Sequence, residues 1–238
     1  ADLYQNTLGR PFETVDFLSR LAAADPADLD VQWRLAALYA ELAIWPRLVE
    51  TLQEIRQRTT EPSERLGAGR RIAATWAEEL ERPDAAIEAY EEVLAEFPED
   101  EESATALETL LAAHGRRTAL VELLHRRLDT LHGDPAARRA VLIRLAAAHE
   151  AQGAVEEACD CLVAARGLGP ADTQLDETLA ATLVRAGRPT AAVALLRDQI
   201  DRHEATGDRS AAAALLVRLA RLQGTSLHDD DAAHRALA

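Results

Sequence analysis

The residues that could perform chemistry are scattered along this chain instead of forming a catalytic motif. Of the seven histidines, His125 and His132 stand seven positions apart. On a helix they would share one face but lie about 10 Å apart along the axis, too far for two ligands of one metal ion. His149 is predicted to be a partly buried, hydrogen-bonded core residue. The sequence has no glycine-rich phosphate loop and no nucleophile motif.

The cysteines and the densest acidic cluster favour structural roles. Cys159 and Cys161 are the only cysteines, and on a helix they point to nearly opposite sides, so they can neither pair nor share a metal. Free thiols favour a reducing compartment, and we expect a cytoplasmic protein. The acidic run 99–102 opens a predicted helix, where the helix dipole favours negative charge. We expect no metal site and no cofactor.

Composition excludes several function classes. The net charge of −15 argues against binding to nucleic acids or to anionic membranes, and no apolar run reaches the roughly 18 residues that a membrane span needs. All 26 basic residues are arginine, which is typical of a GC-rich bacterial genome. The many carboxylates would suit an α/α-barrel hydrolase with two catalytic acids. Such barrels need aromatic sugar platforms, and aromatic residues make up only 4% of this chain. We therefore expect no enzyme.

The segment 81–100 is the clearest structural element. Its apolar residues recur at steps of three and four, which predicts an amphipathic helix with one buried face. Pro83 fits the first turn of this helix, where its missing N–H costs little. Pro98 ends the helix, and Asp100 is placed to cap the next one.

The ending signal repeats every 72 residues, at 26–28, 98–100 and 170–172. Such a period is typical of a solenoid. Gly153 and Gly187, 34 residues apart, each end a first helix, and a longer step near 38 alternates with this one. The pattern predicts an all-α fold of about fourteen antiparallel helices in seven hairpins, at roughly 1–25, 28–59, 63–97, 101–132, 135–168, 172–206 and 208–238.

Both ends of the chain align with the middle of a helix. Ala1 corresponds to Ala73, and Ala238 corresponds to Glu91. Natural solenoids end in polar caps, which neither end has. We expect one repeat array over 1–238 that forms part of a longer protein.

One repeat carries a recognisable family pattern. Its residues are Leu145, Ala146, His149, Gly153, Ala158, Leu162, Ala165 and Pro170. This pattern resembles the tetratricopeptide repeat (TPR), in which small residues let two helices approach closely. A small residue also recurs at Ala36, Ala73, Ala146, Ala180 and Ala220, and Glu108 replaces it once. The resemblance implies a right-handed superhelix of helical hairpins, a TPR-like solenoid, whose first helices line a concave groove.

An arginine series falls on or beside that implied groove. Arg34, Arg71, Arg144 and Arg218 each stand two positions before the small residue of a first helix. The full set of candidate partner-binding residues is Trp33, Arg34, Arg70, Arg71, Arg144, Arg185, Arg218 and Arg221. One interpretation is a basic strip that binds a peptide rich in Asp or Glu. The other is local pairing with glutamates that only solubilises the helices.

Three functions follow from this architecture. The first is a non-catalytic scaffold that binds a protein or peptide along the concave face. The second is a regulatory or sensor domain that controls an attached effector. The third is a structural array that self-associates end to end. The resemblance favours the first.

Overall fold

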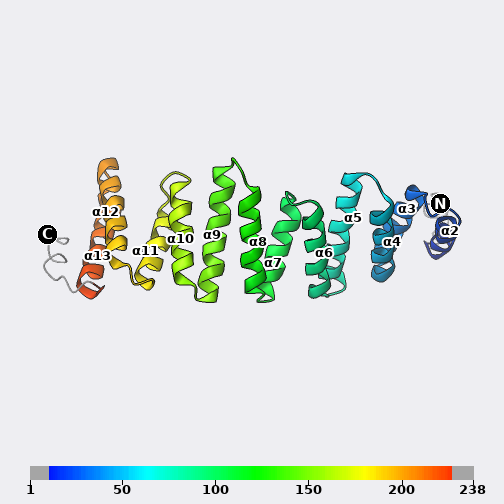
Figure 1. The fold of residues 1–238 in the computed structure, drawn as a ribbon, viewed down its shortest axis with the longest axis horizontal. Coiled ribbons are helices and arrows are strands. Elements are labelled where there is room, and N and C mark those ends of the chain that lie inside the picture. Colours follow the sequence, from blue (N-terminus) through cyan, green and yellow to red (C-terminus); the bar gives the residue numbers. More distant parts are fainter. Residues whose placement is uncertain (1–10, 227–238) are drawn as a thin grey trace. The chain divides into compact units, whose positions relative to one another are not determined.

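A computed structural model describes residues 11–226, and over that range the chain is helical without strands. Twelve α-helices and one short π-helical segment follow one another in the described part (Figure 1). The all-α prediction is confirmed, and the twelve helices predicted within this range are present. The remaining two predicted helices, one at each end of the chain, lie outside the described residues.

The helices fall into two compact units, Ala1–Arg116 and Arg117–Ala238. Unit 1 contains α2 (Pro11–Ala24), α3 (Leu29–Glu41), α4 (Trp45–Arg58), α5 (Pro62–Ala74), the π-helical segment η1 (Thr75–Glu79), α6 (Pro83–Glu96) and α7 (Glu101–Ala113). Unit 2 contains α8 (Arg117–Thr130), α9 (Pro135–Gln152), α10 (Val155–Gly167), α11 (Thr173–Arg185), α12 (Pro189–Thr206) and α13 (Arg209–Ser226).

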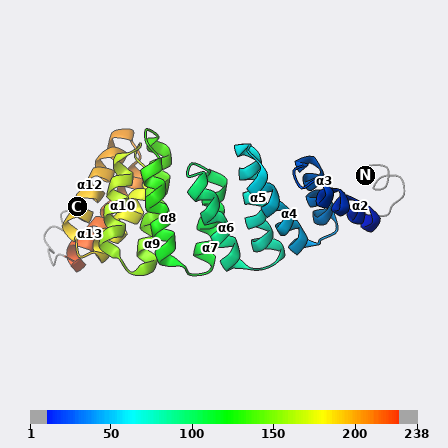
Figure 2. The same ribbon diagram turned by 45° about the vertical axis from the view of Figure 1, so that its right-hand side comes forward.

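Within each unit, a helix packs on the helices that precede and follow it in the chain (Figure 2). In unit 1, α3 contacts both α2 and α4, and α5 contacts both α4 and α6. In unit 2, α9 contacts α8 and α10, and α11 contacts α10 and α12. Packing limited to sequence neighbours is the arrangement of a repeat protein, in which no distant strand or helix closes the core.

Small residues make this close packing possible. Ala36 and Ala73 are completely buried in unit 1, and Ala146 and Ala180 are buried in unit 2. The predicted close-approach positions are therefore in the core. Glu108 takes the same place on α7 and is also buried, although it carries a charge. Leucine, isoleucine and valine side chains of both hairpin helices fill the space around these alanines.

Aspartates begin five of the described helices, including Asp208 before α13, which accepts a hydrogen bond from the Ala211 N–H. Asp28 accepts a hydrogen bond from the Val31 N–H and caps α3, and Asp100 accepts one from the Ser103 N–H and caps α7. Asp134 and Asp172 cap α9 and α11 in the same way. Each side chain satisfies a backbone donor that the first helical turn leaves unpaired.

The turns inside the hairpins require a left-handed backbone conformation. Gly115, Gly153 and Gly187 adopt it with φ values of 66°, 80° and 68°. In the two earlier hairpins the corresponding residues are Ala43, with φ 54°, and Glu81, with φ 50°. In the hairpin that turns at Glu81, the first helix also ends in the π-helical segment η1.

A residue with a Cβ is strained in this conformation, so we expect Ala43→Gly to raise the free energy of unfolding by up to about 1 kcal/mol. Gly153→Ala should lower it by about 1 kcal/mol, because nothing lies within 4 Å of the added Cβ and the cost is conformational. Urea denaturation of both variants tests this expectation. A destabilised Ala43→Gly variant would contradict it.

Candidate functional site

A pocket of about 310 Å³ in unit 1 brings together two of the predicted partner-binding residues. It opens between α5 and α7 above Tyr90 of α6, and its lining residues are Gly67, Arg70, Arg71, Ala74, Tyr90 and Glu102. Gly67 has no atom within 4 Å of where its Cβ would be, so this part of the wall is open. Small residues on α5 thus leave room beside two consecutive arginines.

The guanidinium of Arg70 links its own hairpin to the next one. Its Nε donates to Asp100 Oδ2 at 3.0 Å and its Nη2 to Asp100 Oδ1, while its Nη1 pairs with Glu102. Burial alone would raise the pKa of Asp100, but the hydrogen bonds from Arg70 and Ser103 outweigh burial and lower it. Asp100 therefore stays ionised and serves as both the cap of α7 and the acceptor for Arg70.

Arg71, the next residue, is exposed and has no hydrogen bond or ion pair from its side chain to any described residue. Tyr90 lies beneath it and is buried. Burial, followed by the charges of Glu78 and Glu102, raises the pKa of the Tyr90 hydroxyl, which stays protonated. The pocket thus combines an unpaired guanidinium with a neutral hydroxyl, groups that suit a carboxylate ligand.

The other predicted partner-binding residues differ in their exposure and in their contacts within the chain. On α3, Trp33 is half-buried and Arg34 is exposed without a partner among the described residues. Arg185, at the end of α11, pairs with Glu150 of α9. Arg218 donates to the Glu177 carbonyl at 3.4 Å. The last two, Arg144 on α9 and Arg221 on α13, are half-buried and exposed, respectively.

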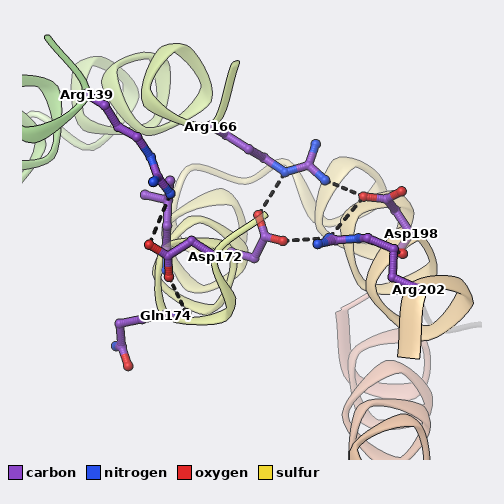
Figure 3. Close-up of polar contacts among 8 residues, drawn as sticks. Arg139, Arg166, Asp172, Gln174, Asp198 and Arg202 are labelled. Carbon is purple, nitrogen blue, oxygen red and sulfur yellow. Dashed lines mark hydrogen bonds and ion pairs between the residues drawn. The ribbon is translucent and has the colours of Figure 1, made fainter. Parts of the chain in front are cut away.

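The sequence analysis missed a buried charge network in unit 2 (Figure 3). The Asp176 carboxylate on α11 is only 1% exposed and accepts from Arg166 Nε of α10 at 2.8 Å and from Arg202 Nη2 of α12 at 2.7 Å. Asp198, on α12, pairs with the same two arginines. The network joins three successive helices.

Electrostatics keep this network ionised. Burial would raise the pKa of Asp176, but the hydrogen bonds and charges of Arg202 and Arg166 outweigh burial and lower it. The hydrogen bond to Asp176 in turn raises the pKa of Arg202. A carboxylate whose pKa is lowered in this way stays ionised and does not exchange protons near neutral pH. The network is therefore suited to holding the three helices together.

His149 is buried in unit 2, as predicted, but one expected feature is missing. Its Nδ1 is buried and has no hydrogen-bond partner among the described residues. Instead, its ring meets His125 of α8 edge to face, with centroids 5.9 Å apart. Burial lowers the pKa of His149, the charge of His125 lowers it further, and Glu157 of α10 opposes this change. The predicted burial of His149 is therefore confirmed, whereas the predicted hydrogen bond is absent at Nδ1.

The two cysteines differ in burial. Cys159 is buried, Cys161 is half-buried, and both are free thiols. Burial raises the pKa of each thiol. Within residues 11–226, no group of three His, Cys, Asp or Glu side chains is placed to hold a metal ion. No helix in that range combines the length and hydropathy that a membrane crossing requires.

Comparison with known proteins supports the repeat assignment. Residues 71–100 match the sequence model of the tetratricopeptide repeat. A search of curated protein sequences finds no significant match.

Two solved structures resemble the chain over nearly its whole length. The C-terminal part of a TPR repeat-containing protein from Cytophaga hutchinsonii covers 99% of this chain and 91% of its own, at 14% identity and a TM-score of 0.53. A structure of Naa15/Naa10 bound to HypK-THB covers 99% of this chain but only 35% of that chain, at 16% identity and a TM-score of 0.63. At these identities the likeness concerns the fold, and it confirms a TPR-like solenoid.

We expect Asp176→Asn to lower the free energy of unfolding at pH 7 by about 3–5 kcal/mol, because it leaves two arginines facing an uncharged, largely buried partner. The folded-state pKa lies below the ordinary value of 3.8. The contribution is therefore complete above pH 4 and is lost as pH falls through the folded-state pKa. Chemical denaturation at pH 7 and pH 3 measures the change. Asp198→Asn, whose side chain is half-exposed, should cost less than about 1 kcal/mol.

We expect His149→Phe to remove a loss of stability that the wild-type protein shows as pH falls below 6.5. Because the folded-state pKa lies below the ordinary 6.5, the unfolded chain binds more protons in that window. Thermal unfolding between pH 7.5 and 5 tests this expectation. An unchanged pH dependence in His149→Phe would contradict the lowered pKa of His149.

Proposed function

We propose that this chain, a TPR-like stack of helical hairpins, is a non-catalytic scaffold that binds an extended acidic segment of a partner protein. The binding surface would be the face formed by the first helices of the hairpins, and Arg71 would be its anchor in unit 1. Proteins of this repeat class generally mediate protein–protein interactions. The free thiols of Cys159 and Cys161 suit a reducing compartment, and we assign the protein to the bacterial cytoplasm.

The different states of two neighbouring arginines carry this proposal. Arg70 is saturated by Asp100 and Glu102, whereas Arg71 projects into the same pocket with its donors unused by any described residue. Exposed arginines without a partner are common, because surface ion pairs contribute little. Arg71 differs from an ordinary exposed arginine because it lines a pocket together with the buried Tyr90. We therefore interpret Arg71 as part of a site that binds a carboxylate of another molecule.

The net charge makes this reading testable. A chain with a charge of −15 repels an acidic peptide at long range, so affinity for such a peptide requires a local basic site. Arg34, exposed and unpaired on α3, supplies a second donor in the same unit. A segment with spaced Asp or Glu side chains would gain affinity from several weak contacts.

The test uses fluorescein-labelled peptides of alternating Glu and Ala, with Lys/Ala peptides as the charge control, titrated with the full chain and followed by anisotropy. We expect the Glu peptide to bind and the Lys peptide to bind without dependence on Arg71. Arg71→Glu should weaken Glu-peptide binding by about tenfold, roughly 1.4 kcal/mol, and reduce its salt dependence.

Arg82→Glu is the matched control. Arg82 is an exposed arginine of the same unit, at the turn between η1 and α6, and its side chain has no partner among the described residues. We expect this variant to bind like the wild type. An equal loss of Glu-peptide affinity in both variants would mean that overall charge controls binding. An unchanged affinity in Arg71→Glu would exclude the proposed site.

A further inference from the structure

Unit 2 has an open groove over α11, between α10 and α12, with a volume of about 650 Å³. We call it the α10–α12 groove. Leu179 and Leu183 of α11 form its floor, and Val163, Ala191, Ala194 and Leu195 line its walls. This volume lies in the range of ligand-binding clefts.

The groove exposes apolar surface that the fold leaves uncovered. Both α10 and α12 pack on α11, and small side chains on the facing walls keep the space between them open. Val163 is 49% exposed at the wall of the groove, near the core residues Leu179 and Leu183. A partner that covered this side chain would gain free energy from removing its apolar surface from water.

Charges stand at both ends of this apolar floor. At one end, the buried Asp176 forms ion pairs with Arg166 and Arg202. These two arginines line the groove together with Asp198 (Figure 3). At the other end, Arg188 has its nearest acceptors, Cys159 Sγ and Asp160 Oδ1, both at 3.6 Å. Both contacts use Nη1, so Nη2 and Nε of Arg188 remain as donors for a ligand.

Arg188 is the least neutralised of the three arginines that line the groove. Arg166 and Arg202 each pair with Asp176 and Asp198. Arg188 has only the Asp160 carboxylate, at 3.6 Å. The Asp160 side chain beside Arg188 is 78% exposed and is mostly solvated.

The corresponding groove of unit 1 lacks this character. It lies over α3, between α2 and α4, and has a volume of about 390 Å³. Two 72-residue steps separate Gln32 from Asp176, and the same two steps separate Tyr39 from Leu183. In unit 1 the neutral Gln32 therefore takes the place of the ion-paired Asp176, and the larger Tyr39 takes the place of Leu183 in the floor. Arg58 pairs with Glu54 on its wall. The apolar floor with an open arginine is thus a property of unit 2 and is not imposed by the repeat.

We propose that the α10–α12 groove docks an amphipathic helix of a partner protein, with three or four aliphatic side chains on the floor and a carboxylate on Arg188. The lining residues on α12 run from Ala191 to Arg202, about 16 Å along that helix, which is enough for roughly three turns of a docked helix. A helix seated between α10 and α12 would bury the exposed valine and complete the packing around α11. This proposal is independent of the acidic-peptide site at Arg71.

The experiment uses three fluorescein-labelled helical peptides of about 14 residues. The first presents Leu at positions i, i+3, i+4 and i+7 with Glu on its flanks, the second replaces Glu by Lys, and the third replaces Leu by Ser. We expect the Leu/Glu peptide to bind the full chain at least about tenfold more tightly than the other two. Ala194→Glu, which fills the groove, should weaken that binding by about tenfold or more, and Arg188→Glu by about fivefold.

Matched controls separate the groove from general effects. Ala181 is exposed on α11 and Arg197 is exposed on α12, and neither lines the groove. Ala181→Glu and Arg197→Glu should bind the peptide like the wild type, and circular dichroism checks that every variant is folded.

Four results would overturn the proposal. These are no binding by the Leu/Glu peptide, equal binding by the Lys peptide, binding that Ala194→Glu leaves unchanged, and displacement of the peptide by submillimolar decanoate. The last result would assign the groove to a small aliphatic carboxylate. Sedimentation of the chain alone adds a fifth test, because self-association that Ala194→Glu abolishes would identify a second copy as the occupant.

Discussion

Arginine–carboxylate pairs between successive hairpins fix how the helices of each unit pack. Arg70 reaches Asp100, and Arg139 reaches Asp172 at 3.0 Å. In both pairs the aspartate already caps a first helix. One side chain therefore sets where a helix begins and how that helix docks on an earlier hairpin. In a fold whose helices contact only their chain neighbours, such links supply the specificity that a central core provides elsewhere.

The same pairing decides which arginines remain for function. Arg70 and Arg71 are consecutive, and one residue on a helix turns the side chain by about 100°. That rotation aims Arg70 at the cap of α7 and leaves Arg71 exposed in the pocket. Arg166 and Arg188 show the same contrast around α11, the first clasped by a buried carboxylate and the second held only weakly. Structural pairing thus consumes some arginines and leaves a few with unused donors.

The two candidate surfaces use different helices and different chemistry. The pocket at Arg71 belongs to α5, α6 and α7 and combines a guanidinium with the Tyr90 hydroxyl. The α10–α12 groove is apolar along its floor and charged at its ends. A repeat protein can carry both because each site is built from adjacent hairpins and needs no distant part of the chain. Copies of one repeat can therefore diverge separately, as Gln32 and Asp176 have done at corresponding positions.

The helices, their caps and their close-approach positions could be predicted from the amino-acid sequence, because they depend on local backbone chemistry and on a repeat period that is visible within one chain. Asp100, Asp134, Gly153 and Ala146 have the predicted roles for that reason. Only the tertiary structure decided the partners of the charged residues. Asp176 is buried because packing brings it to Arg166 and Arg202, which lie 10 and 26 positions away. No pattern of spacing reports the direction in which a long side chain turns, so the sequence marked the arginines without separating those that hold the fold from those left free to bind.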